Sequence, residues 1–223
     1  MLQRLKENAF VKRMAESQRD RISLSASMGL SMNLAYAVYH GVLGFCSRSL
    51  WFLLLGAYYI LLSVMRFGVV RYEAQKQKNA DFLSPDFLLR FLGILFLTLA
   101  VILAFSVYWS FRYDVAIQHQ EVIMIAIAAY TFYKLIAAAV HAVKARRQQS
   151  FWLVALRNIG CADAAASLLT LQRSMLVSFG DMSSRDAGTL NALTGAGVCI
   201  LIAVLGLGMM KRKEKRYGKI KIG

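Results

Sequence analysis

The stretch FLGILFLTLAVILAFSV, residues 91–107, holds 17 consecutive residues without a charged side chain. A transmembrane helix needs about 20 mostly apolar residues to cross the hydrocarbon core of a bilayer. Five further stretches are nearly as apolar, so the sequence predicts an all-α, polytopic membrane protein with six transmembrane helices. The predicted spans are approximately 24–46, 49–67, 87–109, 121–143, 151–172 and 188–210.

The composition of the whole chain agrees with this architecture. Of the 223 residues, 58% are hydrophobic and 17% are charged, against about 25% charged in an ordinary soluble domain. The net charge of +15 raises the question of nucleic-acid binding. The basic residues, however, occur in short blocks between long apolar runs, which is the pattern that membrane insertion produces. We therefore expect the lipid bilayer, and no nucleic acid, as the main partner.

The fifth predicted span is the weakest, because Arg157, Asn158 and Asp163 interrupt its apolar sequence. A protein with five spans and a re-entrant fifth segment is therefore an alternative to six spans. The distribution of positive charge favours six, because a re-entrant segment would place the basic C-terminal tail outside the cell.

Orientation follows from the Lys and Arg residues on each side of the predicted spans. One side holds 21 of them, including Arg66 after the second span, and the other holds four, including Arg173 after the fifth. Cytoplasmic loops carry the excess of positive charge, so we expect a protein of the cell membrane with both termini in the cytoplasm. The predicted regions are a cytoplasmic segment 1–23, a transmembrane domain 24–210 and a basic tail 211–223. The first segment has no apolar core, so we expect no cleavable signal peptide.

The basic tail has seven Lys and Arg residues between 211 and 221. Its expected main role is to hold the C-terminus in the cytoplasm. Contact with anionic lipid headgroups is a second expected role, worth about 1 kcal/mol per basic residue near the surface.

Local similarities between the two halves of the chain indicate an internal repeat. The motif YAVYH, residues 36–40, resembles YTFYK, residues 130–134, and SLW at 49–51 resembles SFW at 150–152. The repeats would cover 24–109 and 121–210. Three spans per repeat force the halves into opposite orientations, which is the inverted-repeat arrangement of many transporters. Chance is the alternative interpretation, because Tyr, Ser and Trp are common at membrane interfaces.

Two ionisable residues inside the spans are expected to meet. Asp163 is the only acid well inside a span, about 20 Å from the cytoplasmic face at 1.5 Å per residue. Lys134 on the fourth span lies about 15 Å deep. A lysine stem covers that difference, so the sequence predicts a Lys134–Asp163 ion pair in which each charge offsets the burial of the other. The pair would either fix helix packing or form a site for a charged substrate or a proton.

Other polar residues share helix faces with this pair. Asn33, Tyr36 and His40 lie at i, i+3 and i+7 on the first span, and Tyr58, Tyr59 and Ser63 are polar residues of the second. Small residues flank them and allow close helix approach. Arg157 is nearer the cytoplasm, where it can extend toward lipid headgroups. The candidate substrate-binding residues are Asn33, Tyr36, His40, Tyr130, Lys134, Arg157, Asp163 and Ser167.

Metal and enzyme chemistry find no support in the sequence. His40 and His141 lie toward opposite membrane faces, and no C-x-x-C or other metal-binding motif is present. Catalytic motifs such as G-x-S-x-G and H-E-x-x-H are also missing. We expect neither a metal nor a cofactor, and no enzymatic activity; a membrane enzyme acting on lipid is the least favoured interpretation.

Two functional interpretations remain. The favoured one is a small membrane transporter or channel that binds a small polar or anionic solute between two three-helix halves. An excess of buried basic over buried acidic groups favours an anion. The alternative is a non-transporting scaffold or accessory subunit, in which the polar groups only specify packing. Glycines at 195, 197, 206 and 208 of the sixth span indicate close packing or a homo-oligomer.

Overall fold

The computed structural model describes residues 26–76, 84–113, 121–145, 151–179 and 183–211. In these residues the chain forms six helices, and the all-α prediction is confirmed. The predicted N-terminal segment and residues 212–223 of the predicted tail lie outside the described residues. The helices are 26–46, α2 (Leu50–Lys76), α3 (Pro85–Tyr113), α4 (Glu121–Ala145), α5 (Phe151–Phe179) and α6 (Ser184–Met210).

Four of these helices, α2, α3, α5 and α6, are long and apolar enough to cross a membrane. The apolar part of α4 is shorter, at Ile127–Val140. Helix 26–46 carries Asn33 and His40 among its apolar residues. Large apolar side chains such as Phe45, Val101 and Ile200 are exposed on the outside of the bundle. A contiguous apolar exterior is what a lipid environment requires, and it would be costly in water.

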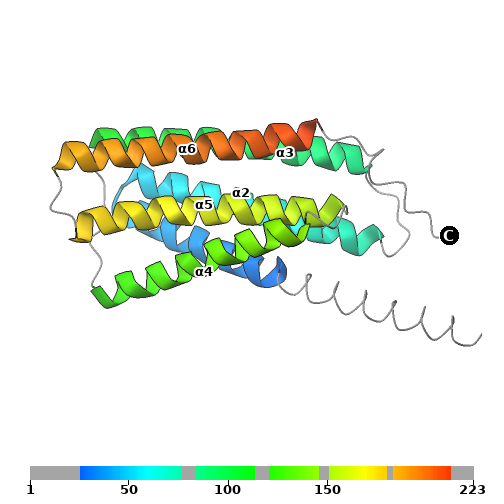
Figure 1. Cartoon of the computed structure of the whole chain (residues 1–223), viewed down its shortest axis with the longest axis horizontal. Helices are drawn as coiled ribbons and strands as arrows, with labels where there is room; N and C mark the ends of the chain where they lie inside the picture. Colours follow the sequence, from blue (N-terminus) through cyan, green and yellow to red (C-terminus); the bar gives the residue numbers. More distant parts are fainter. Residues whose placement is uncertain (1–25, 77–83, 114–120, 146–150, 180–182, 212–223) are drawn as a thin grey trace, which may run out of the picture.

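The helices form an elongated bundle of three layers, with α3 and α6 in one outer layer, α2 and α5 in the middle, and α4 and helix 26–46 in the other outer layer (Figure 1). Successive helices run in opposite directions. The start of helix 26–46 and the end of α6 therefore lie at the same end of the bundle (Figure 1).

Local sequence signals set several helix boundaries. Pro85 is the first residue of α3, where its missing N–H costs nothing, and the backbone N–H of Phe87 donates to Ser84 Oγ at 3.3 Å. At the start of α6, the N–H of Asp186 donates to Ser183 Oγ at 3.2 Å. Arg48 has a φ of 48°, in the tight turn that joins helix 26–46 to α2.

Glycines bring α3 and α6 into backbone contact. A Cβ at Gly206 would lie 3.0 Å from the carbonyl oxygen of Gly93, and a Cβ at Gly195 would lie 2.5 Å from Val107 Cγ2. Gly197 and Gly208, in contrast, have open space around their Cα atoms. Only two of these four glycines of α6 are thus used for packing within the described residues.

Helix α5 is the central helix of the bundle. Of its apolar stretch, 61% is buried within the protein, against 28% for α6. It is a continuous helix of 29 residues, so the alternative of a re-entrant fifth segment is wrong. Its polar residues weaken the apolar signal because they face other helices, and a helix surrounded by protein does not need an apolar exterior.

Two arginines that the charge count assigns to loops are buried inside helices. Helix α2 continues to Lys76, nine residues past the predicted end of the second span, and Arg66 lies within it with 9% exposure. Arg173 lies within α5 with 7% exposure, and its guanidinium is 5.2 Å from the ring centre of Trp51. The loop assignments of these two residues are wrong, but removing them leaves 20 basic residues against three, so the asymmetry persists.

Candidate functional site

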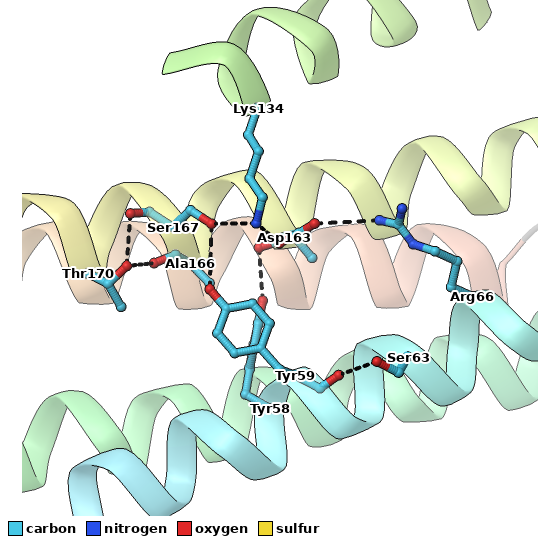
Figure 2. A network of polar contacts seen from close by, with 10 residues as sticks. Tyr58, Tyr59, Ser63, Arg66, Lys134, Asp163, Ala166, Ser167 and Thr170 are labelled. Carbon is cyan, nitrogen blue, oxygen red and sulfur yellow. Dashed lines mark hydrogen bonds and ion pairs between the residues drawn. The ribbon is translucent and has the colours of Figure 1, made fainter. Parts of the chain in front are cut away.

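The Asp163 carboxylate contacts two buried cations, Lys134 on α4 and Arg66 on α2 (Figure 2). Lys134 Nζ donates to Asp163 Oδ1 at 2.7 Å, and Arg66 Nη2 lies 3.5 Å from Oδ2. The exposed fraction of the side chain is 9% for Lys134, 11% for Arg66 and 8% for Asp163. The predicted Lys134–Asp163 pair is thus confirmed, and Arg66 is a second partner.

The ammonium group of Lys134 also lies among three tyrosine rings. Its Nζ is 4.7 Å from the ring centre of Tyr36, 5.0 Å from Tyr130 and 5.8 Å from Tyr59. These distances are within the range at which aromatic faces attract a cation. Nζ donates a further hydrogen bond to Ser167 Oγ at 3.0 Å. The positive charge on Lys134 is therefore stabilised by a carboxylate, a hydroxyl and three aromatic rings.

Helical spacing accounts for this arrangement. On α5, Asp163 and Ser167 are four residues apart and lie on one face, directed at α2 and α4 (Figure 2). On α2, Tyr59, Ser63 and Arg66 follow one another at i, i+4 and i+7, and Ser63 Oγ donates to the carbonyl oxygen of Tyr59 at 2.9 Å.

Small residues on α5 let α2 approach closely. The hydroxyl of the fully buried Tyr58 donates to the carbonyl oxygen of Ala162 at 2.9 Å. The Tyr59 hydroxyl and Ser167 Oγ are 3.5 Å apart. Alanines 155, 162, 165 and 166 of α5 are all buried. A larger side chain at these positions would separate the tyrosine hydroxyls from the α5 backbone.

Gly29 makes room for Arg66. A Cβ at Gly29 would lie 1.5 Å from Arg66 Nη1 and 2.6 Å from Cζ. The guanidinium thus passes directly over the backbone of helix 26–46 on its way to Asp163. Any side chain at residue 29 would displace it.

His40 lies in a stack of aromatic rings beside the charged cluster. Its ring is 5.6 Å from that of Tyr59 with an interplanar angle of 2°, and 6.1 Å from that of Phe52. The stack continues from Tyr59 to Tyr36 at 5.2 Å and from Tyr36 to Tyr130 at 6.0 Å. His40 is thus joined to the site through rings, while no ion pair or hydrogen bond to the charged residues is present in the described part of the chain.

The structure brings together five of the eight candidate residues directly: Tyr36, Tyr130, Lys134, Asp163 and Ser167. Asn33 is 0% exposed, and neither polar atom of its amide has a hydrogen-bond partner among the described residues. It lies one turn from Gly29 and one from Tyr36 on the same helix face, so it is between Arg66 and Lys134 along helix 26–46. Arg157 donates to Asn158 Oδ1 at 3.0 Å from Nη2 and does not join the cluster.

Sequence reasoning missed Arg66 and the full role of Tyr59. The spacing Tyr59, Ser63, Arg66 extends a polar face by two turns, and that signal is present in the sequence. It is obscured because a basic residue near the predicted end of a span is usually a loop residue.

The cluster has an excess of positive charge. Arg66 and Lys134 together carry +2, and Asp163 is the one acid in ion-pair contact with them among the described residues. Arg66 Nε has no hydrogen-bond partner there either. A buried net charge with unused donors favours the binding of an anion, which would pair with the cations and accept the hydrogen bonds. No group of three or more His, Cys, Asp or Glu residues that could hold a metal ion occurs in the described residues.

Comparison of the chain with protein-family models, curated proteins and solved structures finds no significant match.

Proposed function

We propose that this protein is a small transporter or channel of the cell membrane that binds an anionic solute between two three-helix halves. The observation that carries the proposal is the buried cluster in which Arg66 and Lys134 share one carboxylate, Asp163. Burying charge is costly, and buried charges in membrane helices usually mark a solute or ion pathway. A packing role alone would need one cation for one carboxylate.

Six spans follow if helix 26–46 and α4 also cross the membrane. Both lie along α2 and α5 over much of their length (Figure 1). Helix 26–46 is joined to α2 by a turn of only three residues, 47–49. That turn is too short to carry the chain away from the membrane edge at which α2 begins. With six spans, the charge asymmetry places both termini in the cytoplasm.

The helix pairing supports an inverted repeat. A two-fold axis relating the halves would pair α2 with α5, α3 with α6, and helix 26–46 with α4. Each of these pairs is in contact, and Tyr36 stacks on Tyr130, its counterpart in the repeated motif, at 6.0 Å. In transporters with inverted repeats the substrate site lies at the repeat interface near the bilayer midplane.

The alternative function is a scaffold or accessory subunit. It is favoured by the fact that Asp163 is already neutralised by residues of the protein, so that no solute is needed to pair it. In that case the cluster would hold α2, α4 and α5 in register. The two functions predict different results when solutes are offered.

The test is ion flux in proteoliposomes containing the purified full chain. The anion panel is chloride, nitrate, phosphate and pyruvate, with potassium as a cation control. We expect the wild type to increase the flux of at least one anion over protein-free vesicles. Lys134→Met should abolish the increase, and Arg71→Gln, which removes an exposed arginine of the same helix as Arg66, should keep it. Flux of potassium alone, or of none of these ions, would contradict the proposal and favour the scaffold.

A further inference from the structure

We propose that the Asp163 carboxylate occupies the position of the solute's own carboxylate, and that a small monocarboxylate binds between Arg66 and Lys134 together with one proton taken up by Asp163. The inference rests on the proposed anion-binding function, and it specifies the substrate class and the coupled ion.

The geometry of the two ion pairs indicates a carboxylate. Each oxygen of Asp163 is directed to a different cation, Oδ1 to Lys134 Nζ at 2.7 Å and Oδ2 to Arg66 Nη2 at 3.5 Å. A planar group with two oxygens on one carbon can bridge cations in this way. A halide has a single centre and so lacks the two separate oxygen acceptors that meet Lys134 and Arg66 here. The cations are thus already placed at the spacing that a carboxylate requires.

The charge balance supplies the reason for a coupled proton. With Asp163 ionised, the cluster of Arg66, Lys134 and Asp163 has a net charge of +1. A monocarboxylate that takes the bridging position displaces Asp163 from both cations, and a buried carboxylate that has lost its cation partners is favoured as the neutral acid. If Asp163 takes up a proton from the water on the side of entry, a hydronium O–H bond breaks as the Asp163 O–H bond forms, and the net charge stays +1 with the solute bound. Uptake of one carboxylate with one proton is then electrically neutral.

The surroundings keep both cations charged when Asp163 is neutral. The guanidinium of Arg66 does not lose its proton in proteins. The ammonium of Lys134 retains three tyrosine rings and the Ser167 hydroxyl. Cation–π attraction strengthens when water is excluded. The tyrosine rings thus provide what a simple ion pair lacks, which is stabilisation of the cation in the absence of its counter-ion.

Two unused donors and one unused acceptor are available for the remainder of the solute. Arg66 Nε and Asn33 Nδ2 are donors and Asn33 Oδ1 is an acceptor, and none of the three has a hydrogen-bond partner among the described residues. Asn33 is 0% exposed, and it lies between Gly29 and Tyr36 on the helix face that covers the cluster. A hydroxyl or keto oxygen next to the carboxylate, as in lactate or pyruvate, would satisfy such donors.

The other titratable groups around Asp163 come from every neighbouring helix. They are phenols and a thiol, with the His40 imidazole stacked behind Tyr59, apart from the two cations, so Asp163 is the one carboxylate in this region of the described residues. The groups are Arg66, Tyr58 and Tyr59 on α2, Lys134 and Tyr130 on α4, Tyr36 on helix 26–46, and Cys199 on α6, which faces Tyr58.

The first experiment is rescue of Asp163→Ala by formate. This variant removes the carboxylate and leaves its place open between two cations. We expect a low Tm in detergent solution that rises by about 5 °C at saturating formate, since a ligand bound only by the folded state raises Tm. Sodium chloride at the same ionic strength should give no comparable rise, and Lys134→Met/Asp163→Ala should not respond to formate. Equal effects of formate and chloride would overturn the carboxylate assignment.

The second experiment measures proton coupling with the wild-type protein in proteoliposomes. We expect an inward proton gradient to drive labelled pyruvate above its equilibrium level, with one proton per pyruvate reported by an internal pH dye. Asp163→Asn should lose gradient-driven accumulation, while Arg71→Gln, which changes an exposed arginine outside the cluster, should keep it. If the variant does not fold, the wild-type stoichiometry alone decides.

The outcomes separate this inference from the proposed function. Flux of chloride or phosphate without pyruvate would refute the monocarboxylate and leave the anion pathway standing. Pyruvate flux without proton movement would refute the coupling. Absence of flux for every anion would refute the proposed function itself.

Discussion

At the scale of single residues, Asp163 contributes more to the stability of the charged cluster than either Lys134 or Arg66. Removal of Lys134 leaves the carboxylate in contact with Arg66 Nη2 at 3.5 Å, whereas removal of Asp163 leaves two buried cations without a counter-ion. The three residues are therefore not equivalent, although each takes part in the same cluster.

This asymmetry gives the first prediction. Breaking a buried ion pair typically costs about 3–5 kcal/mol, because the remaining charge is left uncompensated. We expect Asp163→Asn to lower the Tm in detergent more than Lys134→Met, and the double variant to recover part of the Asp163→Asn loss, since only Arg66 then lacks a partner. Thermal unfolding of the four proteins measures this. Losses that simply add would mean that the pair is energetically uncoupled.

Gly29 gives the second prediction. A methyl group there would lie 1.5 Å from Arg66 Nη1. The long arginine side chain can move, so Gly29→Ala should fold, with Arg66 displaced from Asp163. We expect its Tm loss to vanish in an Arg66→Gln background, because no guanidinium remains to displace. Gly41→Ala is the matched control, since no atom lies within 4 Å of a Cβ at that position. An equal loss with and without Arg66 would disprove the link.

The Lys134–Asp163 pair could be predicted from the sequence because the depth of each residue follows from counting residues along its helix. The ten residues from Lys134 to Lys144 and the 13 from Ser150 to Asp163 placed the pair at similar depths. Arg66 was missed because counting charges assigns an arginine near a span end to a loop. The burial of Arg66 depends on Gly29, a residue 37 positions away, which no local pattern reveals.

At the scale of elements, the apolar stretches of the sequence located the helices, but they gave the wrong order for how well each would form a continuous long helix. The stretch expected to be weakest, α5, forms a continuous helix of 29 residues at the centre of the bundle. Hydropathy measures compatibility with lipid, and α5 meets mainly protein. The stretches that fall short in length or apolar character are α4 and helix 26–46, which supply Lys134 and two of its three tyrosine rings.

The pairing of α3 with α6 gives the third prediction. A Cβ at Gly206 would meet the Gly93 carbonyl oxygen at 3.0 Å, and this backbone oxygen cannot move aside alone. We expect Gly206→Ala to destabilise the protein by about 1–3 kcal/mol through overpacking. Gly208→Ala, one half-turn away in open space, should be neutral or stabilising by up to about 1 kcal/mol from helix propensity. Chemical denaturation of both variants would reveal the difference; equal effects would contradict the close contact between α3 and α6.

At the scale of the whole molecule, the fourth prediction concerns orientation. With Cys46, Cys161 and Cys199 replaced, a cysteine at Ser47 should react with an impermeant maleimide added to intact cells. A cysteine at Asn79, between α2 and α3, should react only after the membrane is permeabilised. The reason is the excess of Lys and Arg on the side of Asn79. Labelling of residue 79 from outside would reverse the orientation.

The proposed internal repeat was harder to predict than the helices. Two short motifs suggested a repeat, but interfacial residues recur by chance in membrane proteins. Packing supplies independent information, since Tyr36 contacts Tyr130 and α3 contacts α6 along much of its length. Which helices pair is decided by small residues such as Gly93 and Gly206, whose partners lie more than 100 residues apart.

The position of α5 has a consequence for how the chain is made. Helices enter the membrane one after another during synthesis, and each is tested against lipid as it leaves the ribosome-bound channel. Because its sequence contains Arg157 and Asp163, α5 by itself is expected to insert poorly into lipid. Asp163 and Ser167 of α5 find their partners on α2 and α4, which are synthesised earlier. We therefore expect α5 to enter as a partner of helices already in place, so that biogenesis of this protein is tied to assembly of its charged centre.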